Sequence, residues 1–391
     1  MKSLQNIRPV WAEINLDNLA HNIREVRRVT KEDTLITAVV KADGYGHGAA
    51  IAAKTFLNNG ADRLAVATLS EALELRKEGI NAPILILGYT PDSQFEKVIE
   101  NDITQTIYTY EQGINISKAA HKVGKVGKIH VKIDTGMSRL GFVPNKSSVE
   151  DIVKIAKLSG IKIEGIFSHF AKADERDKSA TNEQYKKFKW IIQELESKNI
   201  NIPIKHISNS AAIIDLPQYN LDMVRAGIML YGLYPSNEVN KKAVRLKPAM
   251  TLKAKISHIK EVEKGTGISY GHVYITEKES KIGTLPIGYA DGYTRILTNK
   301  AEVGIKGYKV PVIGRICMDQ CMIDVSSIKD IKVGDEVILF GDGYNNSPHI
   351  DEVAEKLETI NYEIVCMVSR RVPRVYIKQG DIVHIKDYLE E

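Results

Sequence analysis

The chain has 391 residues, and 43% of them are hydrophobic, which is enough for two modules with sizeable cores. Its 54 Lys and Arg residues and 49 Asp and Glu residues give a net charge of +5, spread along the chain without a long basic block. This balance gives no indication of nucleic-acid binding. Residues 1–10 lack the apolar stretch of a signal peptide, and no later segment approaches membrane-spanning length. We therefore expect a cytoplasmic protein with no membrane contact.

The three cysteines, Cys317, Cys321 and Cys366, cannot all pair, and such sparse use is typical of a reducing compartment. Cys317 and Cys321 are spaced like two ligands on one helical turn. No second Cys or His pair follows them at zinc-site spacing. We expect reduced thiols and no metal site.

The first half of the chain alternates between short apolar runs and amphipathic segments. An opening helix is expected at about residues 17–29, and further helical patterns include 70–78 and 183–197. The runs interpreted as strands are 35–40, 63–68, 83–87, 104–108, 129–134, 163–168, 205–208 and 223–228. Eight such units in roughly 230 residues predict a (β/α)8 TIM-type barrel, whose usual length is about 250 residues. An open doubly wound sheet has the same alternation and is the alternative.

The pattern changes from about residue 246 to short strands with few intervening helices. The expected strands are 251–259, 281–285, 301–305, 309–313, 322–325 and 336–340, and one helix is expected at 351–360. The α/β barrel is therefore followed by a C-terminal, mostly-β domain. We predict a barrel domain over residues 11–240 and a β domain over residues 241–391, with residues 1–10 packed on the β domain.

Lys41 is a candidate reactive amine at the end of the first predicted strand. It follows an apolar, β-branched run and precedes a glycine-rich segment that begins at Ala42. Apolar surroundings disfavour the charged form of a lysine, which is the condition for a Schiff base with an aldehyde. A lone lysine after a strand is more often simply solvated. The residues around Lys41 therefore have to decide between a solvated side chain and a reactive amine.

That context is a set of polar residues at equivalent strand ends, where a barrel carries its active face. Besides Lys41 the set contains Arg139, His169, Asn209, Ser210 and Arg225. Each alone is more simply a solvated loop residue, but five at matching positions make that interpretation improbable.

Arg225 lies inside the eighth predicted strand, where a cation needs an acceptor or an anion nearby. Gly227 and Ile228 follow it and offer backbone N–H groups to a phosphate. Ser210 adds a hydroxyl at an expected helix start, although Ser210 as a plain helix cap is nearly as good an interpretation. These residues predict an anion site.

Six stretches together resemble the alanine racemase family. Residues 39–48, VVKADGYGHG, resemble its pyridoxal-phosphate attachment motif. Residues 132–141, 168–171, 208–212, 224–232 and 314–320 resemble further motifs of the family in the same order. The similarity extends from about Arg8 to Tyr376, and the combination is highly specific although no single motif is.

The resemblance implies a pyridoxal 5'-phosphate enzyme with a barrel, a β domain and a homodimer whose active sites are shared between chains. Lys41 would carry the cofactor, and Arg225 would face the pyridine nitrogen and disfavour its protonation. The other residues implied to bind the cofactor are Tyr45, His169, Asn209, Ser210, Gly227, Ile228 and Tyr362.

The resemblance also implies two bases, because racemisation needs proton transfer on both faces of Cα. Lys41 would serve the D-enantiomer face and Tyr270 of the partner subunit the L-enantiomer face, with His169, linked to Arg225, as the neighbour that favours the phenolate. Arg139 and the backbone of Met318 would position the substrate carboxylate and the cofactor oxygen.

Two further residues are implied to shape the site. Tyr289, with Tyr362 and Met318, would narrow the pocket to a small side chain. Lys132 matches a position that is often N-carboxylated in the family, beside Arg139. The alternative is a neutral Lys132 paired with Asp134.

The expected reaction is therefore the interconversion of L-alanine and D-alanine, supplying D-alanine for peptidoglycan. A cofactor-supply protein with a Lys-bearing barrel is one alternative, but such proteins resemble only the barrel half. A related decarboxylase is another, although residues 317–320 do not look like its catalytic cysteine motif.

Overall fold

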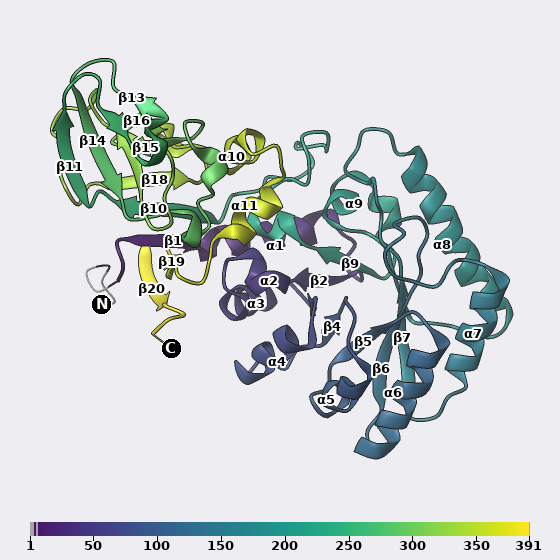
Figure 1. The fold of residues 1–391 in the computed structure, drawn as a ribbon. Helices are drawn as coiled ribbons and strands as arrows, with labels where there is room; N and C mark the ends of the chain where they lie inside the picture. Colours follow the sequence, from purple (N-terminus) through teal and green to yellow (C-terminus); the bar gives the residue numbers. More distant parts are fainter. Residues whose placement is uncertain (1–3, 5–6, 391) are drawn as a thin grey trace. The chain divides into compact units, whose positions relative to one another are not determined.

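The computed structural model describes residue 4 and residues 7–390. The chain divides into two compact units. One contains residues 20–44 and 49–246, and the other contains the N-terminal residues up to Leu19, residues 45–48 and residues 247–391. Figure 1 shows a parallel barrel with its helices in the first unit and an extended β-sheet in the second.

The barrel consists of eight parallel strands with neighbouring strands in chain order. They are β2 (Leu35–Val39), β3 (Arg63–Val66), β4 (Ile84–Ile86), β5 (Thr104–Ile107), β6 (Gly127–Lys132), β7 (Ile161–Phe167), β8 (Ile204–His206) and β9 (Met223–Ala226). β9 pairs with β2, and two 3.1 Å backbone hydrogen bonds, from Asp222 to Lys205 and from Arg225 to Ser208, link it to the β8 side. The predicted TIM-type barrel is confirmed, and each predicted strand lies within two residues of the observed one.

Helices follow the strands and cover the outside of the barrel. They are α3 (Ala49–Leu57), α4 (Leu69–Lys77), α5 (Phe95–Glu100), α6 (Tyr110–Val123), α7 (Lys146–Ala156), α8 (Ser179–Ser197) and α9 (Ser210–Asp215). The local sequence determines several helix starts: Thr68 and Glu71 form a capping box at α4, and Thr109 caps α6, which ends at Gly124 in the left-handed conformation. Some of the connections from strand to helix are short, as between β3 and α4, whereas those from β6 to α7 and from β7 to α8 are longer.

The second unit is built on a ten-stranded, mostly antiparallel sheet in the order β11-β14-β17-β16-β15-β18-β10-β1-β19-β20. Its strands are β1 (Val10–Asn15), β10 (Met250–Lys255), β11 (His258–Val262), β14 (Ser280–Leu285), β15 (Glu302–Ile305), β16 (Tyr308–Ile313), β17 (Cys321–Asp324), β18 (Glu336–Phe340), β19 (Arg374–Lys378) and β20 (Asp381–Lys386). A small hairpin, β12 (Gly267–Ile268) with β13 (Tyr274–Ile275), and the helices α10 (Ile350–Lys356) and α11 (Asn361–Met367) complete it. The expected mostly-β domain is confirmed.

The details of this unit differ from expectation at several places. The strands β1, β19 and β20 were not expected, and the helix expected at 351–360 ends at Lys356. The single strand expected at 251–259 is two strands, because β10 pairs with β1 and β18 whereas β11 pairs with β14. We expected only residues 1–10 to pack on the β domain, but β1 pairs with β10 and β19 through residue 15, and α1 (Leu16–Val29) follows it. In Figure 1 the purple β1 accordingly lies beside the green β10 and the yellow β19. The domain limits at residues 240 and 241 stay a prediction.

Candidate active site

The predicted polar set gathers at the carboxyl ends of the barrel strands. Burial holds the pKa of His169 well below its usual range, and the positive charges that lower it further are Arg225, Lys132, Arg139 and Lys41, in decreasing order. These four side chains therefore lie within electrostatic reach of one imidazole. A cluster rich in cations and poor in carboxylates favours an anionic ligand.

Lys41 follows β2, is half-buried and begins a turn with unusual backbone geometry. Ala42, Asp43 and Gly44 all have left-handed dihedral angles, with φ values of 52°, 52° and 61°. For a residue with a Cβ this conformation costs roughly 1–2 kcal/mol. Strain of this kind persists only where the surroundings hold it, and it concentrates at functional sites.

Several hydrogen bonds hold the turn. The Gly44 N–H donates to the carbonyl of Val40 at 2.9 Å, and Asp43 Oδ1 accepts from the Ala49 N–H at 2.9 Å. The Ala42 N–H donates to Glu71 Oε1 at 2.6 Å. Glu71 Oε2 accepts from Ala67 at 2.7 Å and Thr68 at 3.1 Å, so one carboxylate connects the turn after Lys41 to the loop before α4.

Arg225 is buried in β9, with 3% of its surface exposed, and has only neutral partners within the described chain. Its Nη1 donates to His206 Nδ1 at 2.7 Å, and its Nη2 lies 3.2 Å from His169 Nδ1. Nη2 also donates to the carbonyls of Ser168 at 2.9 Å and Ile207 at 3.0 Å. Burial and the charge of Arg139 lower the pKa of Arg225 to about 9, so the guanidinium keeps its charge at neutral pH. The expected link between His169 and Arg225 is present.

Two further buried histidines continue from Arg225 into the barrel. His206 stacks on Phe167 with ring centroids 4.6 Å apart, and its Nε2 lies 2.9 Å from His130 Nδ1. Because Arg225 donates to His206 Nδ1, the proton of His206 must be on Nε2, where it is donated to His130. Burial is the main cause that holds the pKa of both histidines well below the usual range, so both are neutral.

Lys132 ends β6 and is also buried, with 7% of its surface exposed. Its Nζ lies 4.6 Å from the centroid of the Phe167 ring. The alternative partner considered from sequence, Asp134, is engaged elsewhere: its Oδ1 accepts backbone N–H groups of residues 136, 137 and 138 at 3.0 Å each. Burial, then Arg225 and Arg139, hold the pKa of Lys132 well below its usual range, with Asp134 opposing. The surroundings therefore disfavour the charged form of this amine.

Ser210 and Gly227 come together as the anion-site prediction requires. The Gly227 N–H donates to Ser210 Oγ at 3.0 Å, and the Met229 N–H lies 3.5 Å from the same oxygen. Asn209, not Ser210, is the helix cap, since Asn209 Oδ1 accepts from the Ala212 N–H at 3.1 Å. The interpretation of Ser210 as a plain cap is wrong, and its hydroxyl faces the Gly227–Ile228 segment instead.

The remaining predicted residues are distributed over the two units. Arg139 is exposed in the bend after β6, within the barrel unit. Tyr45 and Tyr362 belong to the second unit, where their ring centroids lie 6.2 Å apart. Their assignment to a phosphate site stays a prediction.

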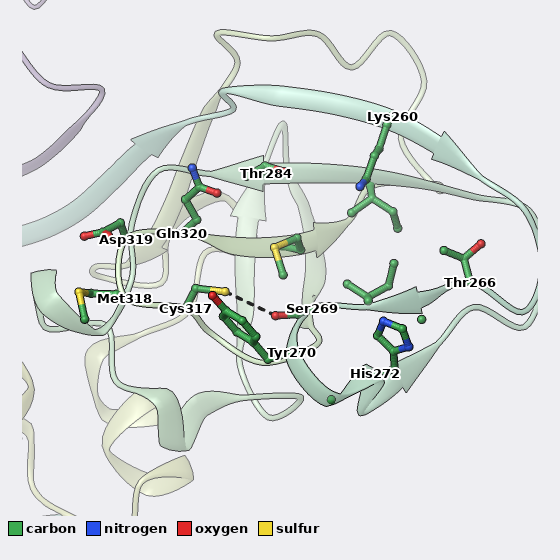
Figure 2. Close-up of a pocket in the computed structure, with 15 residues that line it drawn as sticks. Lys260, Thr266, Ser269, Tyr270, His272, Thr284, Cys317, Met318, Asp319 and Gln320 are labelled. Carbon is green, nitrogen blue, oxygen red and sulfur yellow. Dashed lines mark hydrogen bonds between the residues drawn. The ribbon is translucent and has the colours of Figure 1, made fainter.

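Tyr270 and Met318 line one open groove of about 740 Å³ in the β unit. Figure 2 shows Tyr270, Ser269, Cys317 and Met318 among the residues that surround it. Tyr270 is 69% exposed and Met318 53% exposed. Tyr289, 42% exposed, is tied to the same segment, because its N–H donates to the carbonyl of Cys317 at 3.1 Å. Large exposed aromatic and thioether side chains on a concave surface mark a site of interaction.

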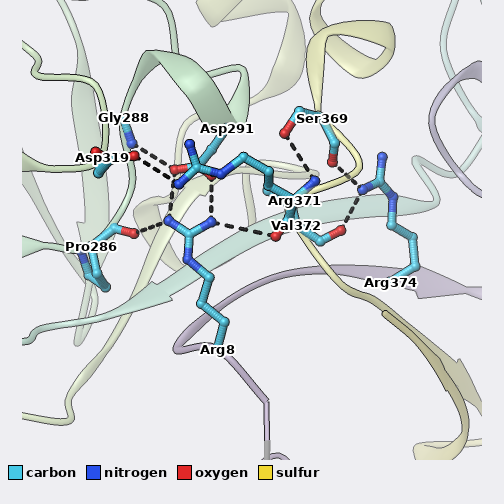
Figure 3. Close-up of polar contacts among 9 residues, drawn as sticks. All are labelled: Arg8, Pro286, Gly288, Asp291, Asp319, Ser369, Arg371, Val372 and Arg374. Carbon is cyan, nitrogen blue, oxygen red and sulfur yellow. Dashed lines mark hydrogen bonds and ion pairs between the residues drawn. The ribbon is translucent and has the colours of Figure 1, made fainter. Parts of the chain in front are cut away.

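A buried carboxylate supports the segment that carries Tyr289 (Figure 3). Asp291 is fully buried, and its two oxygens contact Arg8 at 2.5 and 2.9 Å. Asp291 Oδ2 also accepts from the Gly288 N–H at 3.1 Å, and Arg371 approaches Oδ1 at 3.5 Å. Arg371 in turn pairs with Asp319, the neighbour of Met318, at 2.8 Å. The N-terminal segment thus braces the wall of the groove.

Glu71, His206 and Asp291 were not identified from sequence. His206 alone had a usable signal, because it lies at a predicted strand end on the same face as Ser208. Glu71 and Asp291 act on backbone groups and arginines that are distant in the chain, which no local pattern indicates.

The described residues contain no group of three or more His, Cys, Asp or Glu side chains that is arranged to hold a metal. Among the helices of that same part, none is both long and apolar enough to cross a membrane.

An eight-stranded barrel with a lysine-led polar site at its strand ends, joined to a β domain, is an enzyme architecture of the α/β-barrel class. The family model of the alanine racemase N-terminal domain matches residues 14–235, and that of the C-terminal domain matches residues 249–376. The chain belongs to the alanine racemase family and is an amino-acid racemase, as the sequence motifs indicated.

Individual relatives agree over the full length. The chain is 55% identical to an alanine racemase of Clostridium tetani over 98% of this chain and 100% of the relative. A solved alanine racemase of Clostridium difficile 630 superposes with a TM-score of 0.95 at 51% identity, covering 98% of this chain and 100% of that one. The alanine racemase from Bacillus anthracis with bound L-Ala-P superposes with a TM-score of 0.93 at 38% identity, covering 98% and 99%.

Proposed function

We propose that this racemase interconverts L-alanine and D-alanine with pyridoxal 5'-phosphate, using Lys41 and the partner subunit's Tyr270 as its two bases. The observation that carries the proposal is the buried Arg225 with only neutral partners at the strand ends where Lys41 lies. The solved relative with bound L-Ala-P supports an alanine-sized substrate.

The barrel residues fit this cofactor by their chemistry. Ser210 Oγ and the Gly227 N lie 3.0 Å apart, so both are close enough to bind one phosphate together with the Ile228 N–H. Arg225 can donate hydrogen bonds to a pyridine nitrogen without giving up a proton. When bound, pyridoxal phosphate withdraws electrons from the substrate and makes the proton on Cα acidic.

The proton transfers would then be shared between two chains. Lys41 would hold and move the proton on the D-enantiomer face of Cα, and the partner subunit's Tyr270 the proton on the opposite face. His169 accepts from Arg225 at Nδ1, so its own proton is on Nε2 and available to a phenolate oxygen. The cations that surround His169 also favour a phenolate.

The exposed groove of the β unit supports a homodimer. Tyr270 and Met318 are both more than half exposed there, and a second copy of the chain would cover them. Arg139, exposed after β6, would bind the substrate carboxylate, and the Met318 backbone would position it. Tyr289 and Tyr362 would limit the substrate to a small side chain.

Lys132 is proposed to be N-carboxylated. Its lowered pKa favours the neutral form of the amine, which can attack CO2, giving a carbamate and releasing one proton. The carbamate would supply the anion that Arg139 and Arg225 lack in the described residues. In the cell, we propose that the enzyme is cytoplasmic and supplies D-alanine for peptidoglycan.

The test is racemisation of L-alanine by the purified protein loaded with pyridoxal phosphate, followed by the loss of optical rotation. Lys41→Ala and Tyr270→Phe are each expected to abolish it. Mixing the two inactive variants should restore activity, because one site of each mixed dimer then contains both native residues. Cofactor binding without racemisation by the unaltered protein would overturn the proposal and favour a cofactor-supply role. No recovery on mixing would overturn the shared site.

A further inference from the structure

Tyr270 sits in a turn whose backbone is strained on both sides. The residue before it, Ser269, has φ 64° and ψ −172°, a region essentially restricted to glycine. Gly271 and His272 after it also have positive φ values, 69° and 45°. This turn connects β12 to β13, and a pair of such short strands fixes a turn weakly by itself.

The Ser269 side chain is directed to the neighbouring segment and not to solvent (Figure 2). Its hydroxyl donates to the carbonyl of Arg315 at 2.6 Å, and its Oγ lies 3.5 Å from Cys317 Sγ. Met318 comes next in that segment. The serine hydroxyl therefore connects the turn of Tyr270 to the segment of Met318, and both residues line the same groove.

The packing around the turn leaves little room for another conformation. A Cβ at Gly267 would lie 2.3 Å from the His272 ring, and a Cβ at Gly271 would lie 3.2 Å from Arg315 Nη1. A Cβ at Gly314 would lie 3.0 Å from that of Ser269. The turn is thus closely packed, and the hydroxyl of Ser269 is the side-chain group that offsets the strain at its start.

We propose that Ser269 is a positioning residue for the racemisation: its hydroxyl fixes the turn so that the phenol of Tyr270 is held in one place relative to Met318. The proposal rests on the proposed role of Tyr270. If the serine served only to satisfy its own hydrogen-bonding groups, a turn without backbone strain would serve equally well. The strained backbone therefore indicates that the turn holds a particular geometry.

The test uses the full-length protein with its cofactor and the variants Ser269→Ala, Ser269→Gly and Ser347→Ala. Alanine removes the hydroxyl and keeps the strain, whereas glycine removes the hydroxyl and tolerates the same backbone. Ser347 is the matched control, because it is buried and its hydroxyl donates to the Tyr344 carbonyl at 2.7 Å in the same unit.

We expect both Ser269 variants to lower kcat by about tenfold or more, since small misplacements of a reacting group are costly. The decisive readout is the primary isotope effect with α-deuterated alanine. It should rise for L-alanine, whose proton goes to Tyr270, and fall for D-alanine, whose proton goes to Lys41. Ser347→Ala should leave both isotope effects unchanged.

Parent-like kcat and isotope effects in Ser269→Gly would overturn the inference, and this variant keeps the test valid even if Ser269→Ala does not fold. Equal changes of both isotope effects would also overturn it, because they indicate a general structural role. An inactive parent protein, or a fully active Tyr270→Phe variant, would instead overturn the proposed function.

Discussion

Arg225 Nη1 donates a 2.7 Å hydrogen bond to His206 Nδ1, and the two side chains are 3% and 0% exposed. The bond fixes the tautomer of His206 and thereby makes its Nε2 the donor to His130, 2.9 Å away. The orientation of the guanidinium therefore depends on a histidine that has no direct role in the proposed chemistry.

His206→Phe should destabilise the protein. Phenylalanine preserves the stacking on Phe167 but leaves an N–H of Arg225 and the Nδ1 of His130 without partners in the core. Unsatisfied buried groups cost about 1–3 kcal/mol each, so for these two groups we expect a loss of roughly 2–6 kcal/mol in the free energy of unfolding. Urea unfolding measures it, with His258→Phe on the exposed β11 as the control. A loss no larger than that of the control would contradict the result.

Stability should fall when the pH is lowered below about 6.5, the usual histidine pKa. Burial holds the pKa values of His130, His169 and His206 well below 6.5 in the folded state. The unfolded chain therefore binds more protons at mildly acidic pH, so the free energy of unfolding rises with pH there. Each histidine contributes up to about 1.4 kcal/mol per pH unit between its folded and unfolded pKa values.

Calorimetric Tm values between pH 7.5 and 5.5 measure this dependence. His130→Gln removes one of the three groups and should make the curve less steep. A Tm that is independent of pH in the parent protein would show that these histidines are not held neutral by the fold.

The sequence predicted the barrel strands well because each is an apolar run bounded by polar loops. Each of these strands also pairs mainly with the strands next to it in the chain. The run ending at Val40 is one example, and Lys41 follows directly from it. The left-handed turn after Lys41 was not predictable, because only Gly44 of its three residues prefers that conformation. β1 was missed for a related reason: its partners, β10 and β19, lie more than 200 residues away in the chain.

The same distinction applies to the site. The strand-end position revealed His169, Ser210 and Arg225, because a barrel brings strand ends together whatever the side chains are. The sequence did not predict that Arg225 has neutral partners or that Asp134 binds the backbone of its own loop, because both depend on the three-dimensional structure. Tyr270 came from family resemblance alone, since its turn has no local pattern that indicates chemistry.

Glu71→Gln should weaken cofactor binding, although Glu71 is not among the residues proposed to contact the cofactor. A glutamine amide has one oxygen only, so it cannot accept from both Ala42 and the Ala67–Thr68 pair. The strained turn after Lys41 should loosen, and we expect the Kd for pyridoxal phosphate to rise about tenfold, which corresponds to the roughly 1.4 kcal/mol of one lost hydrogen bond.

Titration of the cofactor-free protein with pyridoxal phosphate measures this Kd. Glu74→Gln is the matched control, because Glu74 lies on the same helix and is also half-buried. An equal Kd in the two variants would assign Glu71 to helix capping alone.

Lys132 should form a carbamate that depends on CO2. Burial and the charges of Arg225 and Arg139 lower the pKa of its amine, which favours the neutral form that reacts with CO2, and both arginines would stabilise the product anion. Protein equilibrated with 13C-labelled bicarbonate should give a carbamate carbon signal in NMR, and Lys132→Ala should lose it. We also expect activity to fall on removal of CO2 and to recover with bicarbonate. A parent spectrum without the signal would show that the amine is unmodified.

Asp291→Asn should destabilise the β unit and raise KM. Asparagine removes the charge that both Arg8 and Arg371 face, and Arg8 is only 26% exposed. Breaking a fully buried pair costs about 3–5 kcal/mol, so we expect roughly 2–4 kcal/mol here because Arg8 retains some water. Asp319→Asn is the control, since it breaks only the exposed pair with Arg371, worth about 1 kcal/mol or less. Equal unfolding free energies in the two variants would show that Asp291 does not brace the Tyr289 segment.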